Sequence, residues 1–277
     1  MRFTQLSGVS IPVLGQGTWQ LGERAERRSR EVAALQLGID LGLTLIDTAE
    51  MYGNGASEEL VADAITGRRD HVFVVTKILP GNATSKQKIV AACERSLRRL
   101  RVEHIDLYLL HWRQGEKLAV VVETFNELAG AGKIRHWGVS NFDVADMKEL
   151  GQLPGGAKVA SNQVLYNVSR RGIEYDLLPQ ARERRLNIMA YTPIEPARIL
   201  RSTTLHEIAK RHNATPVQIA LAWVIRQDGV TAIPRTGSPE HVRENAGAID
   251  IKLSARDLQE IDRGMPPPTE PHSLEMI

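Results

Sequence analysis

The sequence predicts a single (β/α)8 barrel that spans residues 1–277. Three observations support this fold class. Short apolar runs alternate with longer stretches of helical periodicity, which is typical of βαβ units and a parallel sheet. The length suits one such barrel, and no Gly/Ser-rich linker or charge block divides the chain. A doubly wound sheet should carry G-x-G-x-x-G after its first strand, and the only related stretch, LGQGTWQLG, matches poorly and precedes any predicted helix.

Seven apolar runs are predicted as buried strands, and the fold requires an eighth, weaker one. The seven cover residues 43–47, 72–77, 105–111, 134–141, 159–163, 187–191 and 230–235. The first predicted helix lies within residues 29–42, where Val32, Leu35 and Ile39 share one face. Further helices are predicted within residues 57–65, 117–133, 216–227 and 239–249. We expect a short β-hairpin cap at the N-terminus, and a last helix followed by a Pro-rich tail from residue 264 at the C-terminus.

Composition excludes several classes of protein. Charged residues make up 25% and the formal net charge is +2, which does not favour a nucleic-acid or membrane partner. The N-terminus lacks the features of a signal peptide, and no apolar stretch approaches the roughly 20 residues of a membrane span. The single cysteine, Cys93, is predicted to be a buried small hydrophobe. The absence of a signal peptide and of a membrane span leads us to expect a cytoplasmic protein. The eight histidines lack metal-ligand spacing, so we expect no metal site.

Polar side chains follow the predicted strands at their carboxyl ends, where barrel enzymes place their catalytic groups. The first predicted strand ends in Asp47, and Tyr52 lies in the loop that follows it. The second predicted strand ends in Lys77 and the third in His111. A phenol is a weak acid, with an ordinary pKa near 10, and a nearby ammonium lowers that pKa. Lys77 could supply the ammonium, Asp47 its counter-charge, and His111 a hydrogen bond to a substrate oxygen. Each residue alone would be read as a cap or a solvated group, but together they indicate a proton donor aimed at a carbonyl.

These motifs resemble the aldo-keto reductase superfamily. The similarity extends in order through IPVLGQGTW, LIDTAEMYG, LLHW, GVSNF, NQVLYN, AYTPI and IPRTGSPEHVRENAGA, and is closest to bacterial methylglyoxal or general aldehyde reductases. The resemblance implies a catalytic tetrad of Asp47, Tyr52, Lys77 and His111, with hydride from NADPH and a proton from Tyr52.

The resemblance also implies a set of cofactor-binding residues. Ser140, Asn141 and Gln163 match the residues that bind the nicotinamide carboxamide, and Tyr191 matches the aromatic that stacks on the ring. Arg235 and Thr236 match contacts to the 2′-phosphate. The remaining positions implied to bind the cofactor are Thr192, Pro193, Ile194, His241, Glu244 and Asn245. The substrate mouth is implied to include Trp19, Met51, Trp112 and Phe142.

Two departures from the family pattern affect the cofactor site. Many NADPH-specific relatives carry arginine where this chain has His241, so we predict NADPH with some tolerance of NADH. The loop after Pro193 lacks the usual glycine and carries Glu195, a carboxylate that needs Arg198 or Arg201 to offset it near a pyrophosphate. We therefore predict weaker or faster-exchanging cofactor.

Two other functions are consistent with the same fold. One is a non-catalytic NADP(H)-binding redox sensor, although a sensor need not keep all four tetrad residues. The other is an aldolase that uses Lys77 as a Schiff-base nucleophile, for which the lysine pKa would have to be depressed. The reductase interpretation, with a small carbonyl compound as substrate and a monomeric protein, accounts for more of the residues.

Overall fold

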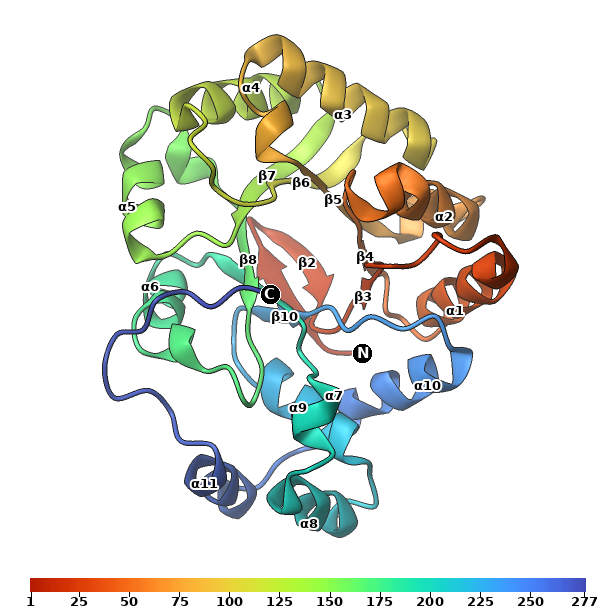
Figure 1. Cartoon of the computed structure of the whole chain (residues 1–277), viewed down its shortest axis with the longest axis vertical. Coiled ribbons are helices and arrows are strands. Elements are labelled where there is room, and N and C mark those ends of the chain that lie inside the picture. Colours follow the sequence, from red (N-terminus) through yellow and green to blue (C-terminus); the bar gives the residue numbers. More distant parts are fainter.

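The computed structural model describes residues 1–277 and contains a ring of eight parallel strands surrounded by helices (Figure 1). Neighbouring strands pair in parallel throughout. The ring runs in chain order through β3 (Gln16–Gly17), β4 (Leu45–Asp47), β5 (Phe73–Ile78), β6 (Ile105–Leu110), β7 (Ile134–Ser140), β8 (Ser161–Leu165), β9 (Asn187–Tyr191) and β10 (Val230–Ala232). Parallel bridges from Leu14 to Ala232 and from Gly17 to Arg235 join the two edges, so the predicted barrel is confirmed.

The eighth strand is β3, which lies within the LGQGTWQLG stretch and was not among the seven predicted strands. It is only two residues long, too short for a periodic pattern to reveal. Gly17 is required there because a Cβ atom would lie 2.8 Å from the Ile233 carbonyl oxygen. The closing strand was therefore predicted to exist but not located.

Eleven α-helices cover the strands or follow them. Those that the sequence anticipated are α1 (Arg28–Asp40), α2 (Ala56–Ile65), α4 (Leu118–Gly130), α9 (Pro216–Ile225), α10 (Pro239–Gly247) and, as the predicted last helix, α11 (Ala255–Gly264). The remaining helices are α3 (Lys86–Leu100), α5 (Val144–Gln152), α6 (Leu177–Glu183), α7 (Pro196–Ile199) and α8 (Thr203–Arg211). None of these helices combines the length and hydropathy that crossing a membrane requires.

The predicted N-terminal hairpin is also present. Strands β1 (Phe3–Leu6) and β2 (Val9–Pro12) pair antiparallel. Leu6 and Ile11 belong to the same apolar cluster as the barrel interior, so the hairpin seals one end of the barrel.

Side chains along a strand point alternately into and out of the barrel, and this alternation determines which residues form the site. Leu45 packs inside the barrel and Ile46 packs outward in the main core, so Asp47 returns to the interior. Val75 and Leu109 also face the barrel interior, so Lys77 and His111, each two residues further along, face it as well. The inward side chains are therefore apolar in the barrel and become polar at its carboxyl end.

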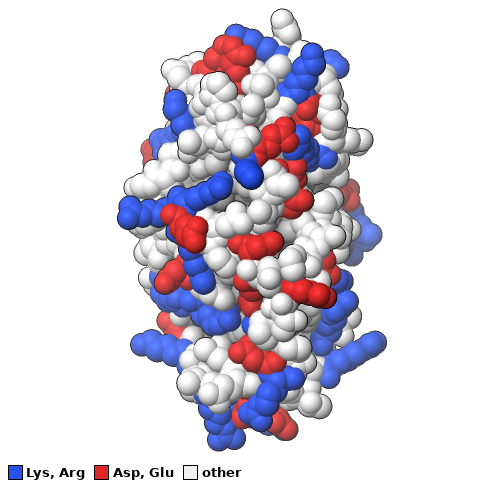
Figure 2. Space-filling model, turned by 90° about the vertical axis from the view of Figure 1, so that its left-hand side faces the viewer, with Lys and Arg blue, Asp and Glu red and all other residues white.

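The C-terminal tail reaches the open end of the barrel. In Figure 1 it runs from α11 past α6, and the C-terminus lies over the strands. Leu274 packs against the main core, and Glu275 forms an ion pair with Arg170. On the side of the molecule shown in Figure 2, basic and acidic side chains are interspersed and no field of one sign dominates.

Candidate active site

A buried ammonium forms the centre of the site. Lys77 Nζ donates to Asp47 Oδ2 at 2.7 Å, to the Thr48 carbonyl at 2.8 Å and to the Tyr52 hydroxyl at 3.3 Å. The Lys77 side chain is fully buried and Asp47 nearly so. All three ammonium protons thus have acceptors, and the predicted contact of Lys77 with both Asp47 and Tyr52 is present.

Tyr52 reaches the ammonium because the chain turns sharply after β4. Gly53, Asn54 and Gly55 have φ of 55°, 53° and 99°, three consecutive left-handed residues that glycine and asparagine tolerate best. Tyr52 also lies near His111, with ring centroids 5.8 Å apart in an edge-on arrangement. The turn therefore brings the phenol to the end of β6 as well as to Lys77.

Burial and charge oppose each other in this group. Burial lowers the pKa of Lys77, but the Asp47 carboxylate and the hydrogen bonds from the ammonium outweigh it, and the net pKa lies above its usual value. For Tyr52 the balance goes the other way. Burial raises the pKa of the phenol more than the Lys77 ammonium lowers it. The expected net lowering of the Tyr52 pKa is therefore wrong for the protein alone.

His111 is held as a neutral imidazole. Burial, assisted by the Lys77 ammonium, lowers the His111 pKa to about 2. Its Nδ1 atom is buried and has no hydrogen-bond partner. A neutral ring has one N–H to donate, so His111 can direct a hydrogen bond to an oxygen without competing with Tyr52 as the acid.

The four residues implied to bind a nicotinamide form one network. Ser140 donates to the Gln163 carbonyl at 2.8 Å, and Asn141 Nδ2 donates to Ser140 at 3.2 Å. Tyr191 donates to Asn141 Oδ1 at 3.0 Å. Gln163 Nε2 donates to Asp47 Oδ1 at 2.7 Å, which connects the network to the tetrad.

The end of the tail meets this network at Tyr191. Burial raises the Tyr191 pKa to about 12, although a hydrogen bond between the Tyr191 hydroxyl and the backbone of Ile277 lowers that pKa in part. The tail therefore lies at the mouth of the barrel.

The segment Thr192–Pro193–Ile194 continues from β9 and is anchored by a residue that the sequence analysis did not single out. Asn167 is fully buried and donates to the Thr192 carbonyl and to Glu195 Oε1, both at 3.0 Å. Glu195 also forms ion pairs with Arg170 and Arg198, both at 3.0 Å. The predicted offset by Arg198 is present. Arg170 was missed because it lies 25 residues away in sequence.

Arg235 extends from the end of β10 into solvent. It donates to Gln20 Oε1 at 2.8 Å, and its guanidinium lies 5.9 Å from the centre of the Trp19 ring. Both partners are neutral, so the full positive charge is available for an anion. The neighbouring Thr236 accepts a hydrogen bond from the Ser238 backbone at 3.0 Å.

The three residues implied to lie near the adenine and its phosphate differ in exposure. His241 is exposed, whereas Asn245 is buried. Glu244 is half-buried and accepts a hydrogen bond from Thr215 at 2.6 Å, so it is not a merely solvated helix residue.

The residues implied to line a substrate mouth fall into two groups. Trp19 and Met51 are 50% and 38% exposed, and Trp112 packs on His111 with ring centroids 4.9 Å apart. Phe142, by contrast, is fully buried in the main core. Its prediction as a mouth residue is wrong, because its side chain is buried in the apolar core rather than exposed at the mouth.

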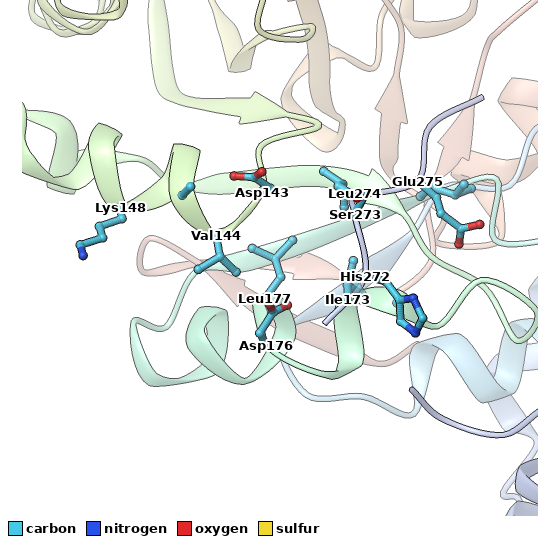
Figure 3. A pocket seen from close by; sticks show the side chains of 13 residues that line it. Asp143, Val144, Lys148, Ile173, Asp176, Leu177, His272, Ser273, Leu274 and Glu275 are labelled. Carbon is cyan, nitrogen blue, oxygen red and sulfur yellow. The ribbon is translucent and has the colours of Figure 1, made fainter. Parts of the chain in front are cut away.

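Beside the mouth lies a cavity of about 390 Å³ between α5, α6 and the tail (Figure 3). Val144, Ile173 and Leu177 provide apolar lining, and His272 and Glu275 of the tail lie along one side. The tail thus forms a wall of this cavity.

With this geometry established, comparison with known proteins identifies the family. The model of the Aldo/keto reductase family matches residues 13–264. The chain belongs to the aldo/keto reductase family. The match includes the barrel and all four tetrad positions, and the superfamily resemblance is confirmed.

Several relatives are similar to this member of the family over their whole length. Methylglyoxal reductase YeaE of Escherichia coli is 48% identical, with 100% of this chain and 99% of that protein covered. An aldo/keto reductase of Klebsiella pneumoniae, solved with NADP and acetate, has a TM-score of 0.96 at 46% identity and covers 99% of both chains. An aldo-keto reductase of Klebsiella pneumoniae solved with NADPH has a TM-score of 0.95 at 45% identity and covers 100% of both.

Proposed function

We propose that this protein reduces small aldehydes and ketones, such as methylglyoxal or aromatic aldehydes, to alcohols, with Tyr52 as the proton donor. The family and its NADP-bound relatives make the chain an NADP-dependent oxidoreductase of carbonyl compounds. The observation that carries the finer proposal is the single ammonium, Lys77 Nζ, that contacts both Asp47 and Tyr52.

The residues present fit a nicotinamide cofactor. Tyr191 offers an aromatic face, the side chains of Asn141 and Gln163 offer amides, and Arg235 offers a cation without a carboxylate partner. When bound, NADPH supplies the hydride, which no side chain of the protein can provide.

Each tetrad residue then has one role. Asp47 keeps Lys77 charged, and Lys77 stabilises the phenolate that Tyr52 becomes after it donates its proton. Neutral His111 donates a hydrogen bond to the carbonyl oxygen and orients it toward the Tyr52 hydroxyl. A bound substrate carbonyl changes the surroundings of the phenol, so proton transfer does not require a low Tyr52 pKa in the protein alone.

The charged state of Lys77 argues against the aldolase alternative. A Schiff-base lysine must be a free amine, which requires a depressed pKa. Here the Asp47 carboxylate raises the Lys77 pKa.

The test is NADPH oxidation, followed by the cofactor absorbance, with methylglyoxal and with an aromatic aldehyde. Tyr52→Phe removes only the acid, and Tyr175→Phe, at a tyrosine that is 45% exposed, is the matched control. We expect turnover to collapse in Tyr52→Phe by at least about 100-fold, with NADPH binding retained, and to persist in Tyr175→Phe. A wild-type protein that binds NADPH but turns over neither substrate would support the sensor instead.

A further inference from the structure

We propose that Glu50 is a positioning residue that holds the Tyr52 loop against the end of β5, so that the phenol meets Lys77. This inference rests on the proposed function. Glu50 is only 6% exposed, and it stands two residues before Tyr52 in the turn after β4. Neither the tetrad nor the predicted cofactor and substrate contacts include it.

The backbone explains why a side chain is needed at this point. Beyond β4, hydrogen bonds from Thr48 N to the Val75 carbonyl and from Glu50 N to the Lys77 carbonyl continue the ladder to β5. The chain then turns away, with Tyr52 N bonded to the Ala49 carbonyl. The next N–H along the β5 side, that of Leu79, has lost its strand partner, and a buried unpaired N–H is costly.

Glu50 takes the place of the missing strand. Its Oε1 atom accepts from Leu79 N at 2.8 Å and from Asn82 Nδ2 at 2.9 Å. Its Oε2 atom faces Arg95 of α3 at 3.6 Å. One oxygen therefore fastens the Tyr52 loop to the segment that follows Lys77, whereas the other makes a looser ion pair with Arg95, whose side chain is 38% exposed.

The clamp matters because the turn itself is locally weak. Three consecutive left-handed residues follow Tyr52, and two of them are glycines, which leave the chain many other conformations. The Tyr52 hydroxyl lies 3.3 Å from Lys77 Nζ, at the long end of a hydrogen bond, so a small shift of the loop would break the contact.

Four variants separate the clamp from other roles of Glu50. Glu50→Ala removes both hydrogen bonds, and Asn82→Ala removes one of them. Glu50→Gln keeps an oxygen that can accept from both Leu79 and Asn82. Arg95→Ala is the matched control, because it removes the ion pair to Oε2 and leaves the clamp intact.

We expect Glu50→Ala to lower kcat by about 100-fold, the loss typical of a displacement near 1 Å, with KM and the NADPH dissociation constant nearly unchanged. Asn82→Ala should lie between, and Glu50→Gln and Arg95→Ala should resemble wild type. In a Tyr52→Phe background, Glu50→Ala should cost nothing further, because it acts through the phenol. An equal loss with and without Tyr52, or no rescue by glutamine, would overturn the proposal.

Amide hydrogen exchange over residues 51–55 tests the clamp without turnover. Faster exchange in Glu50→Ala than in Arg95→Ala supports it, and equal exchange overturns it. Should wild type reduce no carbonyl compound, the proposed function fails on that result alone, and the exchange experiment still decides whether Glu50 holds the loop.

Discussion

Replacing Lys77 by methionine would remove the only ammonium that neutralises Asp47 while keeping most of the side-chain volume. Lys77 Nζ lies 2.7 Å from Asp47 Oδ2, with the two side chains 0% and 4% exposed. After the change, Asp47 keeps a hydrogen bond from Gln163 but no counter-charge. An uncompensated buried charge of this kind costs about 3–5 kcal/mol, which is a large part of the total stability of a typical protein, about 5–15 kcal/mol.

A double-mutant cycle isolates this effect. Asp47→Asn alone leaves a buried ammonium unpaired, whereas Asp47→Asn with Lys77→Met leaves no buried charge. The double variant should therefore lose several kcal/mol less than the sum of the two single losses. Urea unfolding, with the slope m compared between variants, measures each free energy of unfolding. A cycle on the exposed pair Lys86–Glu127 is the control and should show much weaker coupling.

The pH dependence has a definite sign. The folded Lys77 pKa lies above the unfolded value of 10.5, so its stabilising effect is fully present below pH 10.5 and is lost as pH rises through the folded value. The contribution of the Lys77 charge to the stability gap between wild type and Lys77→Met should be present in full at neutral pH and shrink only above 10.5. A loss below about 1 kcal/mol for Lys77→Met, or strict additivity in the cycle, would refute the reasoning.

Three further predictions follow from the site. The pKa of His111 is about 2 in the folded protein and 6.5 in the unfolded chain, so between these values only the unfolded state binds a proton at this residue. The free energy of unfolding should therefore fall as pH drops below 6.5, and His111→Gln should flatten that dependence in urea titrations. Arg235→Ala should weaken NADPH binding by about 10-fold or more and leave NADH binding nearly unchanged. In wild type the NADPH and NADH dissociation constants should differ by less than about a thousandfold, because the imidazole of exposed His241 is a poorer partner for a phosphate than a guanidinium; a larger ratio would contradict this. Stopped-flow binding of NADPH should show no slow closure step. Arg170→Met removes one of the two cations paired with Glu195 and should make NADPH binding weaker than in wild type; unchanged binding would place Glu195 away from the cofactor.

Much of the site could be predicted because strand ends are visible in a sequence. Asp47, Lys77 and His111 follow apolar runs, and all three lie at the carboxyl end of the barrel as expected. Ser140, Asn141, Gln163 and Tyr191 come from three different strands and join in one network, as parallel strands in one barrel require. By contrast, β3 was not located, because a two-residue strand carries no periodicity.

The predictions that failed depended on quantities that are set by the whole fold. The expected lowering of the Tyr52 pKa took account of the Lys77 charge but not of the burial that exceeds its effect. The family resemblance implied that Phe142 lies at the substrate mouth, but its side chain is buried in the core. The Glu195 pairing with Arg170 and the Glu50 bond to Leu79 join distant loops, so neither has a local signal.

The barrel, the order of its strands and the chemical groups at their ends could be predicted from the amino-acid sequence, because alternation and strand polarity are local properties of the chain. How those groups affect one another depends on the folded barrel. The 3.3 Å contact between Lys77 and Tyr52, the neutral state of His111 and the hold of Glu50 on the turn depend on burial and on distances between separate loops. Electrostatic energies depend steeply on burial and on distance, and both are fixed only in the closed barrel.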